Sequence, residues 1–254
     1  PDRLYTRADG SDFDDLNIYA VSAQTFLNRL RLPFSMQIVP VFGGPPTPKT
    51  LWWLTGLMLM LEGLAQLSDR GWFGVLDLRG LMISYGAFWD FLFPPGAVHQ
   101  ALFPGQSYSM LLTHAFLHAG TIHVLMNAVI FIALGKTLAV YFGLRLVMVT
   151  MLLGALSSGV AFGLLESTAA PMVGASGVVF AFIGLWLQAS RSELKRLGRP
   201  GRSTASVMMS LIVIHVLLHV FMGGQIAWQA HLGGFVAGYF LMPWLIDRSH
   251  SPTY

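Results

Sequence analysis

The sequence contains no cysteine and few charged residues. Without cysteine, the chain can form no disulfide, no thiolate nucleophile and no Cys-ligated metal site or cluster. Charged residues make up only 11% of it, against about 25% in soluble globular proteins. Hydrophobic residues make up 54%, and the mean hydropathy is +0.61. This composition predicts a polytopic membrane protein. The net charge of +3 does not indicate nucleic-acid binding, because the basic residues flank apolar segments instead of forming one patch.

Six apolar segments are long enough to cross a bilayer, for which about 20 mainly apolar residues are needed. They are residues 51–67, 121–140, 144–165, 173–189, 205–222 and 230–246. With these spans, 13 of the 15 Lys and Arg residues fall on one side of the membrane, and such an excess marks the cytoplasmic side. We therefore expect an all-α bundle of six transmembrane helices with both termini in the cytoplasm.

The spans divide the chain into three regions. We expect a cytoplasmic extension over residues 1–49, a six-span domain over 50–248 and a short cytoplasmic tail over 249–254. Residues 68–120 form a long loop on the outer side, and its many aromatic side chains suit the lipid headgroup region. Residues 1–48 lack the uninterrupted apolar core of a cleavable signal peptide, and they do not look like an organellar transit peptide. A bacterial inner membrane is the expected location.

Polar residues occur where three of the spans begin on the outer side. His123 and Asn127 lie in the first two turns of the second span, Ser176 lies in the first turn of the fourth, and His231 lies in the first turn of the sixth. Polar groups are costly inside a bilayer and mark functional sites there. Because all three spans start on the same side, we expect the four side chains at one depth.

This set of residue types suits hydrolysis. A serine becomes a nucleophile when a neighbouring base takes its proton, and His231 is the candidate base for Ser176. His123 and Asn127 share one helix face, and together with the Ser176 N–H they could donate hydrogen bonds to an oxyanion. The nearest outer-side acid in the sequence, Glu166, is only weakly implicated, so a Ser–His dyad is the simpler hypothesis. Small residues would let the fourth and sixth spans approach closely; they are Gly177, Ala181, Gly184, Gly234 and Gly238.

Three segments resemble the rhomboid family of intramembrane serine proteases. They read H-x-x-x-H-x-x-x-x-H-x-x-x-N over residues 114–127, G-A-S-G over 174–177 and H-x-x-G-x-x-x-G over 231–238. The G-x-S-G pattern is weak alone, but the order, spacing and span placement of all three segments make the resemblance specific. It covers about residues 50–248 and implies a six-helix rhomboid-like bundle.

Carried over to this sequence, the resemblance implies Ser176 as nucleophile and His231 as general base. It implies an oxyanion hole made of His123, Asn127 and the Ser176 amide. His118 would hold the outer loop, and the remaining motif residues would be structural, namely His114, Gly174, Gly177, Gly234 and Gly238. Rhomboids cleave single-span membrane proteins near the outer end of the substrate helix, within the lipid bilayer and without a cofactor or metal.

The sequence departs from the family pattern at two places. Many rhomboids carry Trp-Arg in the outer loop, where this chain has Ser109 and Met110. Many also carry a glutamate between two glycines of the second span, where this chain has Ala139 between Gly135 and Gly143. Because both features are structural in the family, we expect them to affect loop seating, stability and substrate access more than chemistry.

Other interpretations of these residues stay open at this point. The pair His114 and His118 has the i, i+4 spacing of zinc ligands, but no H-E-x-x-H pattern or third ligand accompanies it. The second such pair, His215 and His219 in the fifth span, suits buried polar contacts, and Glu62 in the first span is unexplained. Three classes remain: a protease, a rhomboid-like protein that binds transmembrane clients without cleaving them, and a small transporter or channel. A transporter predicts polar residues along the whole membrane depth, whereas here they gather at one end.

Overall fold

The computed structural model describes most of the chain between residues 38 and 241. The described residues are 38–41, 44–94, 101–166, 170–196, 198 and 226–241, together with 206, 209–210, 212–213, 215–216 and 220. The expected extension and tail, residues 1–49 and 249–254, therefore lie largely outside the described residues, as does most of the predicted span 205–222. The described part is mostly helical, and its other regular structure is one isolated β-bridge.

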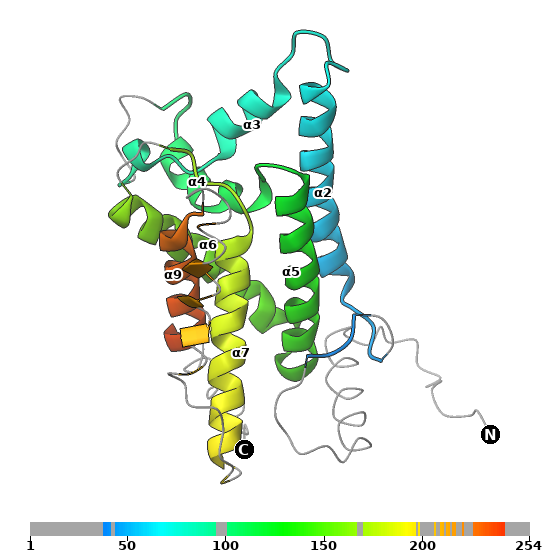
Figure 1. Cartoon of the computed structure of the whole chain (residues 1–254), viewed down its shortest axis with the longest axis vertical. Coiled ribbons are helices and arrows are strands. Elements are labelled where there is room, and N and C mark those ends of the chain that lie inside the picture. The colour runs from blue at the N-terminus through cyan, green and yellow to red at the C-terminus, as the bar shows by residue number, and fades with distance from the viewer. Residues whose placement is uncertain are drawn as a thin grey trace, which may run out of the picture.

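Four long helices coincide with the first four predicted spans. They are α2 (Lys49–Asp69), α5 (Thr121–Phe142), α6 (Leu144–Leu165) and α7 (Ser176–Arg196), and Figure 1 shows α2 running beside α5 and α7 crossing in front of α6. Of the described helices, α5 and α6 are both long and apolar enough to cross a membrane. The beginning of the sixth predicted span is α9 (Trp228–Val236), which continues as the π-helical turn η4 (Ala237–Leu241). The count of six spans stays a prediction.

Helices α5, α6 and α7 pack together with α2 around an apolar core. Leu51 of α2, Phe131 and Leu138 of α5, and Phe182 of α7 are fully buried in it, and the rings of Phe131 and Phe182 stack with centroids 5.5 Å apart. Ala139 is 1% exposed in the same core, so a glutamate there would be buried among apolar side chains, at a high desolvation cost. The departure at this position therefore suits its surroundings.

A lysine inside α5 fixes the end of the core that lies next to residues 38–41. Lys136 is 1% exposed, and its Nζ donates hydrogen bonds to the carbonyl oxygens of Pro40 and Val41 at 2.6 and 3.1 Å. Thr137 Oγ1 accepts a hydrogen bond from the Val39 N–H at 3.0 Å. A buried ammonium is costly unless it is hydrogen-bonded, so these contacts attach residues 38–41 to α5.

The region between α2 and α5, the predicted outer loop, is more regular than the sequence indicated. It contains the helices α3 (Leu78–Gly86) and α4 (Gln106–Thr113) and the short turns η1 (Asp90–Leu92) and η3 (His114–Phe116). Its aromatic side chains also divide into two groups: Trp72 is 75% exposed, as suits a headgroup contact, but Phe88 is fully buried against Met110 and Phe162. The expectation of a headgroup-facing aromatic loop is therefore too general, because Phe88 belongs to a small core that seats the loop on α6.

Candidate active site

Ser176 and His231 meet where α7 and α9 begin. Ser176 is the first residue of α7, and His231 lies in the first turn of α9. The Nε2 atom of His231 lies 2.7 Å from the Oγ atom of Ser176, which is within the range expected for a nucleophile and its base. Both residues are half-buried, so the pair combines a partly water-excluded setting with residual access.

Glycines allow α7 and α9 to approach this closely. A Cβ atom added to Gly234 would collide with the carbonyl oxygen of Gly177, and one added to Gly238 would collide with the carbonyl oxygen of Ala181. On the other face of α7, a Cβ atom on Gly177 would collide with the side chain of Ser158. Small residues at such crossings are the usual device of membrane helix packing. They set the backbone separation that places His231 beside Ser176.

Two aromatic rings surround His231. Phe180, one turn after Ser176 on α7, stacks on the imidazole with ring centroids 4.4 Å apart and planes inclined by 10°. His215, from the predicted fifth span, places its Nδ1 atom 3.4 Å from Nδ1 of His231. Sequence reasoning treated His215 as a general buried contact, because spacing alone does not show which helix faces it.

Glu166 contacts the start of α9. Its Oε2 atom accepts a hydrogen bond from Nε2 of Gln229 at 2.7 Å, two residues before His231. Among the described residues, the group that faces the far nitrogen of His231 is another histidine. The geometry is that of a Ser–His pair with a second histidine beside the base.

The side chains of His123 and Asn127 lie beside Gly174, two residues before Ser176. Gly174 has a φ of 126°, which L side chains rarely adopt, and a Cβ atom there would lie 2.8 Å from Nε2 of His123 and 3.7 Å from Nδ2 of Asn127. Asn127 is 5% exposed, and its Nδ2 has no hydrogen-bond partner within the described part of the chain. A buried amide donor left open is costly unless something binds to it. The position suits an incoming carbonyl oxygen.

The tautomer of His123 follows from its other nitrogen. Nδ1 of His123 accepts a hydrogen bond from the Ala119 N–H at 3.4 Å. In a neutral imidazole one nitrogen accepts and the other donates, so Nε2 carries the hydrogen on the side of Gly174. His123 and Asn127 therefore both present N–H groups to the same place.

The segment that leads into Ser176 is attached to the outer loop by three separate contacts. Met172 and Phe88 exchange two backbone hydrogen bonds of 2.9 Å, the Gly174 N–H donates to the carbonyl oxygen of His114 at 2.9 Å, and the Ala175 N–H donates to Nε2 of His118 at 3.4 Å. These contacts fix the backbone immediately before the serine.

The two loop histidines are buried and uncharged. Burial lowers the pKa of His114 to about 4; burial, together with the nearby ring of His123, lowers the pKa of His118 to about 3. Nε2 of His114 lies 3.2 Å from the carbonyl oxygen of Ala155 on α6. Within the described ranges, no three His, Asp or Glu side chains gather as metal ligands would. Both histidines instead contact the backbone around the Ser176 segment.

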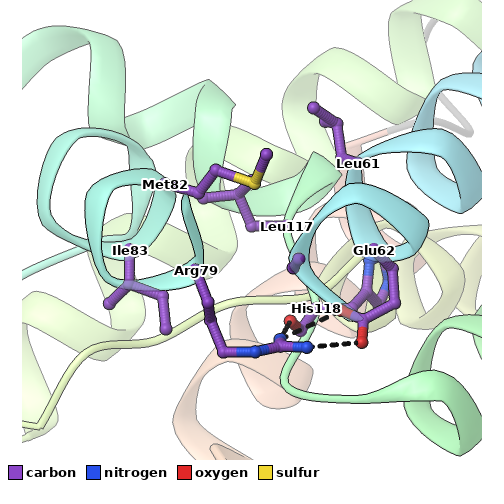
Figure 2. Close-up of a pocket in the computed structure, with 8 residues that line it drawn as sticks. Leu61, Glu62, Arg79, Met82, Ile83, Leu117 and His118 are labelled. Atoms are coloured by element: carbon purple, nitrogen blue, oxygen red, sulfur yellow. Dashed lines mark hydrogen bonds and ion pairs between the residues drawn. The ribbon is translucent and has the colours of Figure 1, made fainter. Parts of the chain in front are cut away.

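Sequence reasoning missed the ion pair that seats the loop on α2. Arg79 of α3 contacts both carboxylate oxygens of Glu62, at 2.9 and 3.2 Å, and Nη1 also donates to the carbonyl oxygen of His118 at 3.2 Å. Figure 2 shows the guanidinium between these two groups. Its Nε donates to Asp69 at 2.7 Å, and the hydrogen bond to Glu62 raises the pKa of Arg79 above its already high value. Glu62 is therefore a paired residue, although no local pattern joins it to a partner 17 positions away.

Comparison with known proteins identifies the family. Residues 105–248 match the Rhomboid domain, which is more than half of the chain, and the protein belongs to the rhomboid family of membrane-embedded proteins. It is 30% identical over 148 residues to "RHOMBOID-like protein 5" of Arabidopsis thaliana, and the match covers 58% of this chain and 47% of that protein.

Relatives that are named as proteases have similarly low sequence identity to this chain. The chain is 31% identical over 153 residues to "Rhomboid protease GlpG" of Photorhabdus laumondii, a match that covers 58% of this chain and 52% of the relative. It is 25% identical over 244 residues to "Rhomboid-like protease 3" of Toxoplasma gondii, with 92% of this chain and 81% of the relative covered. The chain spans about half the length of the first two of these relatives.

Proposed function

We propose that this protein is an intramembrane serine protease that hydrolyses peptide bonds of single-span transmembrane proteins near the outer face of the membrane. The observation that carries the proposal is the 2.7 Å contact between Ser176 Oγ and His231 Nε2. Membership of a family with relatives named proteases supports it. The proposed location is a bacterial inner membrane with both chain termini in the cytoplasm and lipid around the helices.

The reaction begins when Ser176 Oγ attacks the carbonyl carbon of the substrate and His231 Nε2 takes the hydroxyl proton. The substrate oxygen gains negative charge beside Gly174, where the N–H groups of His123 and Asn127 can donate to it. The Ser176 N–H is a further donor, because the first N–H groups of a helix have no intrahelical partner. His231 then passes its proton to the leaving amine, and the serine ester remains.

Water completes the reaction. With His231 acting again as base, water attacks the ester, the carboxylic acid product leaves and Ser176 regains its proton. A substrate helix must unwind locally before cleavage, because its carbonyl groups are otherwise bound within the helix. Small or helix-breaking residues near the cleaved bond therefore favour cleavage. No cofactor or metal takes part in the proposed chemistry.

The test compares the unmodified protein with Ser176→Ala in proteoliposomes that contain a single-span substrate. Removal of the nucleophile should abolish cleavage, since equivalent changes cost about 10⁶ in kcat in a well-studied serine protease. A matched control is Ser210→Ala, because Ser210 is exposed and its Oγ donates to the Ser206 carbonyl oxygen one turn earlier. A fluorophosphonate should label the unmodified protein and Ser210→Ala, but not Ser176→Ala.

The opposite result would favour a different class of protein. If neither the unmodified protein nor the control cleaves any of several substrates, and no fluorophosphonate label appears on Ser176, the protease assignment fails. Retained binding of the transmembrane segments under those conditions would support the client-binding protein instead.

A further inference from the structure

One peptide unit in the outer loop is held at both ends by polar side chains. It joins His118 to Ala119: its carbonyl oxygen accepts a hydrogen bond from Arg79 Nη1 at 3.2 Å, and its N–H donates to Nδ1 of His123 at 3.4 Å. The C=O and N–H of a peptide are conjugated and lie in one plane. The Arg79 guanidinium at the carbonyl oxygen therefore polarises the Ala119 N–H, which contacts His123 at the other end of the same peptide unit.

The guanidinium is itself fixed in place. Glu62 is 4% exposed and contacts Arg79 through both carboxylate oxygens, while Asp69 accepts from its Nε. A planar guanidinium held by two carboxylates has a defined direction, and the second hydrogen of its Nη1 atom is directed at the His118 carbonyl oxygen (Figure 2). The carboxylate of α2 thus determines where the arginine of α3 meets the loop.

We propose that Glu62 and Arg79 are positioning residues for His123, acting through the peptide unit between His118 and Ala119. The charge-assisted bond at the carbonyl polarises the peptide and strengthens its N–H as a donor. The N–H holds His123 in the tautomer with hydrogen on Nε2, the atom that lies beside Gly174. Through this chain of contacts, an ion pair between α2 and the loop sets one of the two side-chain donors of the proposed oxyanion hole.

The kinetic effect expected from this arrangement rests on the proposed function, but its effect on the His123 tautomer does not. The tautomer of His123 is a property of the folded protein, and it can be measured in a protein that cleaves nothing. A simple loop tether would predict lower stability on loss of Arg79 but no change in the imidazole. The two explanations therefore differ in a measurable quantity.

The experiment is ¹⁵N NMR of histidine-labelled Ser176→Ala protein in nanodiscs, in which a protonated and an unprotonated ring nitrogen have well-separated shifts. The His123 signals are assigned by their loss in a His123→Gln variant. We expect hydrogen on Nε2 alone when Arg79 is present, and a mixture of both tautomers in Arg79→Gln. Glu62→Gln should give a smaller change in the same direction, because the arginine remains but loses its fixed orientation.

Two variants serve as controls. Asp69→Asn removes a charge but keeps a side-chain oxygen that can accept from Arg79 Nε, and both contacts to Glu62 stay in place, so it should leave the His123 signals unchanged. Arg79→Lys keeps a cation that can reach the carbonyl oxygen without the bidentate contact to Glu62, so its tautomer ratio should lie between those of the unmodified protein and Arg79→Gln. It also provides a second measurement if Arg79→Gln fails to fold.

Kinetics in the otherwise unmodified protein give a second readout. If Ser176-dependent cleavage is established, Arg79→Gln should lower kcat by about 10- to 100-fold with little change in KM, as expected for a misplaced transition-state donor. An unchanged His123 spectrum in Arg79→Gln overturns the proposal, whether or not the protein cleaves substrates. If the spectrum changes but the unmodified protein cleaves no substrate, the positioning role is supported and the proposed protease function fails.

Discussion

The contact between α9 and α7 gives the sharpest test of how helix packing builds the site. In Gly234→Ala, the new Cβ atom would overlap with the carbonyl oxygen of Gly177, whereas normal C···O contacts are about 3.3–3.6 Å. Relief therefore requires α9 to move away from α7 by on the order of 1 Å. His231 lies three residues earlier on the same helix, so the imidazole moves with it and its 2.7 Å contact with Ser176 is lost.

The expected effect on stability is smaller than the effect on activity. Overpacking costs about 1–3 kcal/mol, but alanine in place of glycine in a helix regains about 1 kcal/mol. We therefore expect a net loss of about 0–2 kcal/mol, with the protein still folded. A displacement of this size at a reacting pair costs about 10²-fold in rate. The assay is cleavage of a single-span substrate in proteoliposomes, paired with thermal melting in detergent.

A matched control separates these two effects. Gly56 of α2 has open space where a Cβ atom would lie, so Gly56→Ala should leave cleavage unchanged and keep or slightly raise the melting temperature. The reasoning is refuted if Gly234→Ala cleaves as fast as the unmodified protein. It is also refuted if Gly56→Ala loses activity to the same extent, because the loss would then come from a general response to alanine in the bundle.

Two other measurements test the surroundings of the site. His215→Phe keeps a ring beside Phe180 but removes the nitrogen that faces His231 Nδ1, so kcat should fall with little change in KM. His215→Asn, which can place an amide oxygen near that position, should recover most of the rate; equal losses in both variants would contradict this reason. The lowered pKa values of His114 and His118 predict a second effect, because between about pH 4 and 6.5 the unfolded state binds more protons than the folded state. Stability should therefore fall as the pH drops through this range, by up to about 1.4 kcal/mol per pH unit for each histidine. The free energy of unfolding, measured by chemical unfolding at several pH values, should depend less steeply on pH in His118→Gln than in the unmodified protein.

The long helices and the meeting of Ser176 with His231 could be predicted because they depend on simple patterns. Apolar segments over residues 121–140 and 144–165 correspond to α5 and α6, and Gly143, with a φ of 82°, separates them. Because the fourth and sixth spans begin on the same side of the membrane, we expect Ser176 and His231 at one end of the bundle, and the structure brings them together there. The catalytic role of the pair stays a prediction.

The outer loop could not be predicted to the same depth. Its helices α3 and α4 are short and lie among aromatic residues and glycines, so their formation depends on tertiary packing more than on local pattern. The ion pair between Glu62 and Arg79 joins residues on different elements, and a sequence gives no distance between them. The position where many rhomboids carry Trp-Arg is filled here partly by Met110, which is fully buried, and an arginine elsewhere in the loop, Arg79 of α3, contacts the His118 carbonyl oxygen.

The three attachments of residues 172–175 to the loop also bear on when the site comes into being. Their partners lie far away in sequence, at Phe88, His114 and His118, so none can form until the loop and residues 172–175 come together. Contacts between distant segments carry a large loop-closure cost and form late in folding. A chain still being inserted into the membrane therefore has its serine without a fixed backbone or a partnered imidazole. Under the proposed function, the nascent protein cannot yet cleave its neighbours, since completing the fold is itself the activating step.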